Sequence, residues 1–157
     1  MQDDPENKFI IFSQWEDVLD IAEKAFNENN ISNVRLGSGK KLASSLNRFK
    51  HDPCVNALLL PIKKGANGLN LIEATHVILI DSIVSKAVES QAIGRIHRIG
   101  QSKETMVHRF IVEDTIEEKI DALQKSKSET DLSSQKRRNL KTDARLTGEE
   151  LRILFEC

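Results

Sequence analysis

The stretch Phe9-Ile10-Ile11-Phe12 decides the fold, because four consecutive apolar residues follow a polar start and precede a segment with helical periodicity. Such a run is typical of a strand buried on both faces, as in parallel sheets covered by helices. Segments with helical periodicity separate it from later runs of the same kind, at 34–36, 57–60, 76–80 and 107–112. This alternation predicts an α/β fold with an open parallel sheet sandwiched by helices.

The helical segments are predicted from apolar positions that recur on one face and from capping residues at their starts. In the first segment, the apolar residues from Val18 to Phe26, with Ile21 among them, fall on one face. Two later helices are predicted to begin with capping boxes, Thr115 with Glu118 and Thr147 with Glu150. The predicted helices cover 18–26, 42–49, 88–97, 115–123 and 146–155.

Length and composition predict one folded domain with a polar extension. A chain of 157 residues fits a single domain with its own core. We expect a flexible start over 1–7, the folded lobe over 8–124, a flexible linker over 125–145 and a short helix within 146–157. The linker is predicted because Ser, Lys, Arg, Gln and Asp dominate that stretch.

Charge and cysteine content exclude several classes of protein. The net charge of −1 does not predict nucleic-acid binding, so such a role would need a local basic cluster. Neither cysteine suits a disulfide framework or a zinc site, and we expect no metal site and a reducing compartment inside the cell. No apolar run is long enough to cross a membrane, so no membrane contact is expected. The basic clusters are Lys40-Lys41, Lys63-Lys64 and Lys136-Arg137-Arg138.

The segment Gln91-Ala-Ile-Gly-Arg-Ile-His-Arg-Ile-Gly-Gln101 carries the clearest chemical signal in the chain. Arg95 and Arg98 are three residues apart, so on a helix they would share one face, with Gln91 one turn earlier. Two adjacent guanidinium groups suit the spread negative charge of a phosphoryl group in transfer. Spacing alone favours a plainer interpretation, in which both arginines pair with surface acids.

The whole segment resembles motif six of the Swi/Snf-type branch of superfamily-two helicases, Gln-Ala-x-x-Arg-x-His-Arg-x-Gly-Gln, and all seven fixed positions match. Residues 8–14, Lys-Phe-Ile-Ile-Phe-Ser-Gln, resemble motif four, and residues 65–71, Gly-Ala-Asn-Gly-Leu-Asn-Leu, resemble motif five. Within this family, residues 58–61, 72–77 and 146–155 are similar to a branch of helicase-like ubiquitin ligases that carry a RING inside their motor.

This resemblance implies the second, RecA-like motor lobe of a DNA-dependent ATPase that moves along double-stranded DNA. ATP and Mg²⁺ would be bound mainly by a first lobe, so this chain would not be active alone. Arg95 and Arg98 would be the catalytic residues that reach the terminal phosphate. The resemblance further assigns nucleotide binding to Gln91, Gly68 and Asn70, and DNA binding to Gly65. For Lys63 and Lys64 two interpretations stay open, DNA binding through phosphate contacts or plain solvated surface lysines.

The resemblance also implies partners and a cellular location. The first lobe of the same protein and double-stranded DNA or chromatin would be the main partners, and an upstream RING would bind a ubiquitin-conjugating enzyme. The implied location is the nucleus, in DNA repair or chromatin remodelling.

Departures from the family pattern leave a second interpretation open, a non-catalytic lobe that serves as a scaffold for protein partners. Pro61-Ile62 stand where the family usually has Ser-Thr, which removes two hydroxyls suited to DNA phosphate. An independent nucleotide-binding enzyme is not expected. The stretch Gly37-Ser-Gly-Lys40 lacks the spacing of a phosphate-binding loop, and no Gly-x-Gly-x-x-Gly turn follows a strand.

Overall fold

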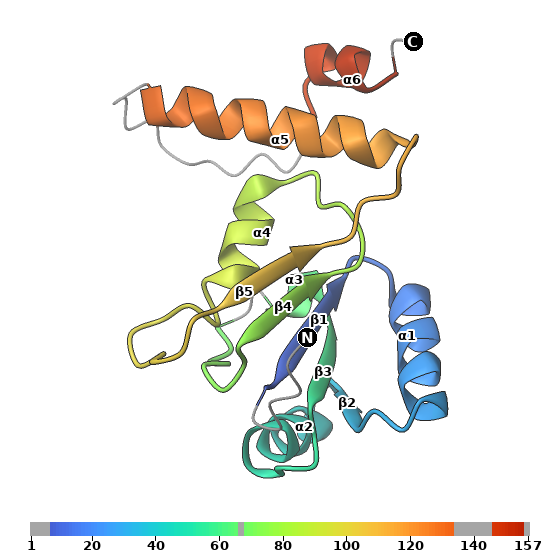
Figure 1. The fold of residues 1–157 in the computed structure, drawn as a ribbon, viewed down its shortest axis with the longest axis vertical. Coiled ribbons are helices and arrows are strands. Elements are labelled where there is room, and N and C mark those ends of the chain that lie inside the picture. Colours follow the sequence, from blue (N-terminus) through green and yellow to red (C-terminus); the bar gives the residue numbers. More distant parts are fainter. Residues whose placement is uncertain (1–6, 66–67, 134–145, 156–157) are drawn as a thin grey trace.

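The computed structural model describes residues 7–65, 68–133 and 146–155. Its five strands form one sheet in the order β2-β3-β1-β4-β5. All neighbouring strands are parallel, and β1 lies at the centre (Figure 1). The predicted parallel α/β architecture is therefore confirmed. The strands are β1 (Phe9–Ser13), β2 (Asn33–Arg35), β3 (Ala57–Pro61), β4 (His76–Leu79) and β5 (Met106–Arg109).

Helices cover the sheet and its carboxyl end. α1 packs against β1, β2 and β3, whereas α3 contacts β1, β3 and α4. α5 lies across the end to which the strands point, and α6 packs on α5 (Figure 1). The helices are α1 (Glu16–Glu28), α2 (Lys40–His51), α3 (Ile62–Gly65), α4 (Lys86–Ile93), α5 (Ile116–Ser133) and α6 (Gly148–Phe155).

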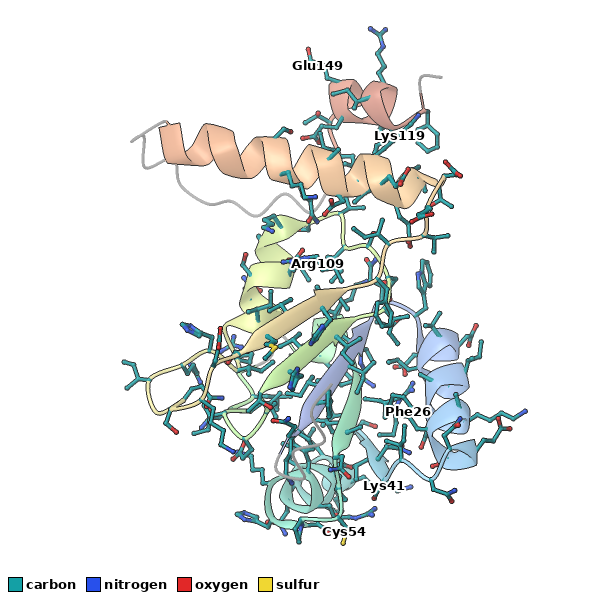
Figure 2. All side chains as sticks on the ribbon, in the orientation of Figure 1. Phe26, Lys41, Cys54, Arg109, Lys119 and Glu149 are labelled. Atoms are coloured by element: carbon teal, nitrogen blue, oxygen red, sulfur yellow. The ribbon has the colours of Figure 1, made fainter. Side chains whose placement is uncertain are left out.

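The apolar strands feed two cores, one on each face of the sheet, because successive side chains of a strand point to opposite faces. Ile10 and Phe12 of β1 join the larger core with residues of α2 and α4. Ile11 joins the smaller core, where Leu19 and Phe26 of α1 pack (Figure 2). Burying such a side chain contributes about 1.5–3 kcal/mol, so the run in β1 stabilises both layers at once.

The predicted linker is corrected over its first part. α5 continues to Ser133, so residues 125–133 are helical and the helix predicted over 115–123 is too short. The stretch is polar and has three serines among its nine residues, but it also contains Lys125, Lys127, Glu129 and Leu132, whose helix propensity is high. Residues 1–6 and 134–145, which belong to the predicted flexible start and linker, lie outside the described residues, as does the cluster Lys136-Arg137-Arg138.

Two predictions about apolar positions are also corrected. Ile21 is 69% exposed, because it lies two residues, and so about 200° around the helix, from the buried Leu19, on the solvent side of α1. β5 ends at Arg109 rather than at residue 112, since its neighbour β4 already ends at Leu79. One further bond, from the N–H of Phe110 to the carbonyl of Leu79 at 3.1 Å, closes the pairing.

One of the two predicted capping boxes is formed as expected. The N–H of Thr147 donates to the Glu150 carboxylate at 2.7 Å, and the N–H of Glu150 donates to the Thr147 hydroxyl at 3.3 Å. At the start of α5, the Thr115 hydroxyl instead accepts the N–H of Glu117 at 3.2 Å. The Glu117 carboxylate, and not that of Glu118, reaches back to accept the N–H of Val112 at 2.8 Å.

A pair of histidines links β4 and β5 on the α1 side of the sheet. His76 Nδ1 lies 3.0 Å from His108 Nε2, and the two rings are stacked with centroids 5.3 Å apart. Phe9 stacks on the other side of His76, which is only 7% exposed. Burial, and then the charge of the neighbouring His108, lower the pKa of His76. The sequence indicates surface or satisfied core histidines but not their pairing.

We expect the free energy of unfolding of the chain to fall between about pH 7.5 and about pH 5.5 because of this pair. The pKa of His76 in the folded state lies below its ordinary value of 6.5. Its contribution is therefore complete above that value and is lost as the pH falls towards the folded pKa. Denaturant unfolding at both pH values measures the loss, which should shrink in His76→Phe and persist in the exposed control His51→Gln. An unchanged loss in His76→Phe would show that the pair is not responsible.

Candidate functional site

The candidate site is built around the turn that follows α4. α4 ends at Ile93, so the helix predicted over 88–97 is too long and Arg95 and Arg98 lie outside it. The carbonyl of Arg95 accepts the N–H of Leu71 at 3.1 Å, which diverts it from the helical ladder. The argument that both arginines share one helix face is therefore wrong. We name residues 94–101 the arginine turn.

The segment 68–74 holds the arginine turn in place. The side-chain amide of Gln101 donates to the carbonyls of Ile72 and Ala74, at 2.7 and 2.9 Å. Together with the bond from Leu71 to Arg95, three hydrogen bonds join the two segments. Ile96 of the turn is fully buried and packs in the larger core. Segment 68–74 overlaps the stretch that resembles motif five, and the arginine turn lies in the stretch that resembles motif six. These two segments are thus one connected unit.

The predicted nucleotide-binding residues lie at the exposed edges of this unit. Gly68 and Asn70 are exposed at the start of the segment, and Gln91 is exposed on α4. Gly68 has a φ of 72°, a left-handed conformation that glycine adopts without strain.

The two arginines differ in their surroundings. Arg95 is half-buried, whereas Arg98 is exposed and, within the described residues, has no ion-pair partner. The interpretation in which both arginines pair with surface acids is therefore wrong for Arg98. Its guanidinium remains accessible to an anion from outside the chain. It lines an open surface hollow of about 500 Å³ together with His97, Ile99, Gln101, Lys103, Glu104 and Thr105.

A buried ion pair orients α4, which carries the arginine turn. Glu89 is only 2% exposed, and its carboxylate accepts hydrogen bonds from Nε of Arg109, at 3.0 Å, and from Nη2 of the same side chain. Lys86 adds a second cation at 3.5 Å. Arg109 lies where β5 passes α4 (Figure 2), so the pair couples helix to strand. The sequence analysis missed it, although Glu89 is three residues from the buried Ala92 and hence on the inward face.

The carboxyl ends of β1 and β4 are joined through Asp81. Both carboxylate oxygens of Asp81 accept the N–H of Gln14, at 3.2 and 3.1 Å. The side-chain amide of Gln14 also donates to the carbonyl of Ser82 at 3.1 Å. Asp81 therefore has a structural role, as a lone aspartate at a strand end predicts.

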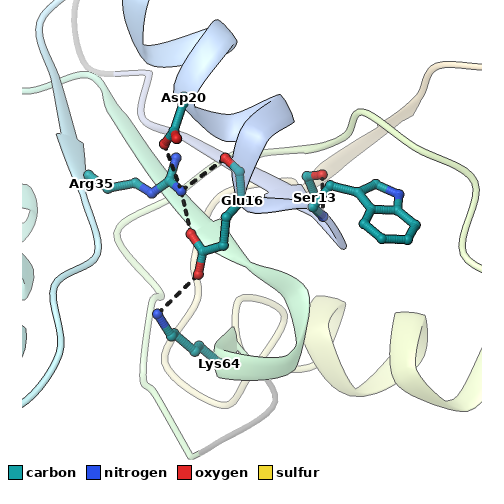
Figure 3. A network of polar contacts seen from close by, with 6 residues as sticks. Ser13, Glu16, Asp20, Arg35 and Lys64 are labelled. Carbon is teal, nitrogen blue, oxygen red and sulfur yellow. Dashed lines mark hydrogen bonds and ion pairs between the residues drawn. The ribbon is translucent and has the colours of Figure 1, made fainter.

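The predicted DNA-binding lysines lie on α3. Lys63 and Lys64 are exposed, and α3 ends at Gly65. Lys64 Nζ lies 3.3 Å from Oε1 of Glu16, the first residue of α1 (Figure 3). The other carboxylate oxygen of Glu16 accepts a hydrogen bond from Arg35 of β2, and this bond is the main cause of the lowered pKa of Glu16.

A second surface hollow lies beside Lys64. It measures about 240 Å³ and is lined by the loop 36–39 together with Leu42, Lys64 and Leu69. Gly39, at the N-cap of α2, has a φ of 57° and supplies no side-chain cap, and no acidic residue stands in the first turn. The positive end of the helix dipole is therefore open here. The loop contains Gly37-Ser-Gly39, which the sequence indicates is a turn rather than a phosphate-binding loop.

Metal and membrane sites find no support in the structure. Within residues 7–65, 68–133 and 146–155, no three His, Cys, Asp or Glu side chains are grouped so that they could hold a metal ion. None of the helices in these ranges combines the length and apolar character needed to span a membrane.

Comparison with known proteins identifies relatives of the chain. Residues 1–100 match the family model of the helicase conserved C-terminal domain. The chain is 49% identical over 131 residues to E3 ubiquitin-protein ligase SHPRH of Mus musculus, which covers 83% of this chain and 8% of that protein. It is 41% identical over 124 residues to DNA repair protein RAD5A of Arabidopsis thaliana, covering 77% of this chain and 12% of that protein.

A solved structure has a similar fold. The C-terminal part of the Fun30 ATPase domain superposes with a TM-score of 0.75 at 28% sequence identity, over 94% of this chain and 46% of that chain. This similarity confirms the predicted RecA-like arrangement of a parallel sheet between helices. Because the chain spans only 8% and 12% of the two curated relatives, most of each relative lies outside the matched region.

The buried ion pair between Glu89 and Arg109 predicts a measurable loss of stability in the variant Glu89→Gln. The amide keeps the shape of the side chain but removes the charge that Arg109 and Lys86 face. We expect the free energy of unfolding to fall by about 1–3 kcal/mol, the range for a buried hydrogen bond to a charged group. Denaturant unfolding measures this change, with the exposed Glu118→Gln of α5 as a control that should stay within about 0.5 kcal/mol of wild type. Equal stability of both variants would contradict the structural role of the pair.

Proposed function

The chain belongs to the helicase conserved C-terminal domain family, and from this premise we propose that it is the second motor lobe of a DNA-stimulated ATPase that moves along double-stranded DNA. The observation that carries the proposal is the arginine turn, which presents an accessible Arg98 on a scaffold tied to segment 68–74. A guanidinium without an acid partner can bind an anionic ligand without first breaking an ion pair. The three hydrogen bonds to the neighbouring segment limit its freedom before the ligand arrives.

ATP and Mg²⁺ would bind mainly to a first lobe, which supplies the phosphate-binding loop and the metal-binding acid. The residues present in this chain fit a complementary role, because the guanidinium groups suit the terminal phosphate. Arg95 and Arg98 would stabilise the charge that develops during phosphoryl transfer, as arginine fingers do. Three further residues would lie near the nucleotide, namely Gln91, Gly68 and Asn70.

DNA would bind on the side of α3. Lys63 and Lys64 are exposed cations suited to phosphate contacts, and Gly65 ends their helix. The open amino end of α2 borders the same hollow as Lys64 and offers a second attraction for a phosphate. α3 also contacts α4, so a shift of the DNA-binding side would be transmitted towards the arginine turn. Closing the two lobes on ATP and reopening them after hydrolysis would move the lobe along the duplex.

The longer protein would be a helicase-like ubiquitin ligase that acts in DNA repair or on chromatin in the nucleus. The similarity to an E3 ubiquitin-protein ligase and to a DNA repair protein supports this context. The first lobe and double-stranded DNA would be its main partners for this chain. A RING elsewhere in the longer protein would contact the ubiquitin-conjugating enzyme.

The second candidate function is a non-catalytic scaffold lobe for protein partners. Two observations favour it. Pro61 and Ile62 are buried and carry no hydroxyl for a phosphate, and Lys64 is already paired with Glu16. The accessible Arg98 weighs against this candidate, because a scaffold has no need of an unpaired cation at this turn.

Arg98→Ala in the longer protein should abolish DNA-stimulated ATP hydrolysis and leave the fold intact. Loss of an arginine finger lowers turnover by about 10³-fold or more, whereas loss of an exposed side chain changes stability by less than about 0.5 kcal/mol. Steady-state ATP hydrolysis with and without duplex DNA measures the first effect, and thermal unfolding measures the second. Arg152→Ala, an exposed arginine on α6, removes the same charge and should keep full turnover. Retained turnover in Arg98→Ala would favour the scaffold.

A further inference from the structure

Lys64 is held by an acid that comes from a different part of the chain. Its ammonium lies 3.3 Å from Glu16, and the two residues are 48 positions apart. Figure 3 shows this pair at one end of a chain of charges that continues through Arg35 to Asp20. The ammonium of Lys64 can make this ion pair and the proposed DNA contact at the same time only if Glu16 and a phosphate both lie within its reach.

Glu16 is the stationary member of the pair. Arg35 donates to the Glu16 carboxylate and also to the backbone carbonyl of Glu16, at 3.3 Å. The side chain of Arg35 is only 20% exposed, and its guanidinium is also paired with Asp20 at 3.3 Å. The Glu16 carboxylate is therefore held from the side opposite Lys64, on a residue that starts α1. Although the Glu16 side chain is 54% exposed, these bonds to Arg35 restrain its carboxylate if Lys64 turns away.

Lys64 is the member that can move. Its side chain is 45% exposed, and the residue borders the hollow beside loop 36–39. The ammonium therefore has two alternative directions, towards Glu16 or towards an anion in the hollow. An exposed ion pair is weak enough to be exchanged for another anion. A phosphate that approaches Lys64 also meets the negative charge of Glu16, which repels it.

We propose that Glu16 competes with a DNA phosphate for Lys64 and thereby limits the affinity of this lobe for the DNA backbone. The proposal rests on the proposed function, because it requires that Lys64 contacts DNA. Glu16 would keep the lobe from binding too tightly to any one position on the duplex, as a motor that steps along it requires. The ligand class is the phosphate backbone of double-stranded DNA, without preference for sequence.

The test is the affinity of Glu16→Gln for a fluorescently labelled duplex of mixed sequence, measured by fluorescence anisotropy on the longer protein. Glutamine keeps an oxygen for Arg35 but no longer attracts Lys64 or repels phosphate. We expect affinity to rise about 3-fold or more at low salt, in keeping with the strength of exposed pairs. The gain should fade as salt screens the charges. Thermal unfolding of the variant confirms that the fold is retained.

Two controls isolate the competition. Glu28→Gln, at the other end of α1, removes the same charge from a residue that pairs with Lys24 at 3.9 Å, and it should leave affinity unchanged. The double variant Glu16→Gln/Lys64→Ala should gain much less over Lys64→Ala than Glu16→Gln gains over wild type, because only the repulsion between the acid and the phosphate is then removed. A gain in Glu28→Gln equal to that in Glu16→Gln would reduce the effect to net charge and overturn the proposal.

The outcomes separate this proposal from the proposed function. If Lys64→Ala binds DNA as tightly as wild type, the DNA contact at Lys64 fails and the competition fails with it. If Lys64→Ala weakens binding but Glu16→Gln matches wild type, the DNA contact stands and the competition alone is wrong.

Discussion

The candidate site depends on the hydrogen bonds that tie segment 68–74 to the arginine turn. Most backbone N–H groups of the turn bond within the turn or to the end of α4, but the carbonyl of Arg95 is satisfied by another part of the chain. Leu71 supplies an N–H to the carbonyl of Arg95, and the carbonyls of Ile72 and Ala74 accept the amide of Gln101. Leu71 and Ile96 are both fully buried beside these bonds. A substitution that shifts segment 68–74 will therefore also shift Arg98, although none of these three hydrogen bonds involves the Arg98 side chain.

The two candidate phosphate-binding side chains, Arg98 and Lys64, differ in their surroundings. On one side, Arg98 is exposed without an acid partner among the described residues. On the other side, Lys64 is restrained by Glu16, which Arg35 holds in turn. An unpaired arginine suits a phosphoryl group in transfer, because no ion pair within the chain weakens the attraction of its guanidinium for the ligand. A paired lysine suits a ligand that is bound and released many times, such as the backbone of a duplex.

The sheet could be predicted from the sequence because its strands are short runs of apolar residues, and such a run predicts a buried strand without reference to distant residues. Phe9–Phe12 and Ala57–Leu60 have no polar residue to compete with the core. The site could be predicted only in part. Motif matches select Arg95 and Arg98, but the bond that joins the carbonyl of Arg95 to Leu71 links residues that are distant in sequence. The partner of Lys64 is 48 residues away and leaves no local pattern. The extension of α5 could not be predicted for another reason, because residues 125–133 are mostly Ser, Thr, Asp and Lys and so have the composition of a linker.

The most direct test of the account is DNA-stimulated ATP hydrolysis by the longer protein, measured beside this chain alone and beside an equimolar mixture of this chain with the first lobe. The account predicts turnover in the longer protein and none in this chain alone, because the proposal assigns the phosphate-binding loop to the first lobe. Partial recovery in the mixture would place the missing chemistry in that lobe. Turnover by this chain alone, or no turnover by the longer protein when both lobes are folded and duplex DNA is present, would contradict the assignment of a second motor lobe.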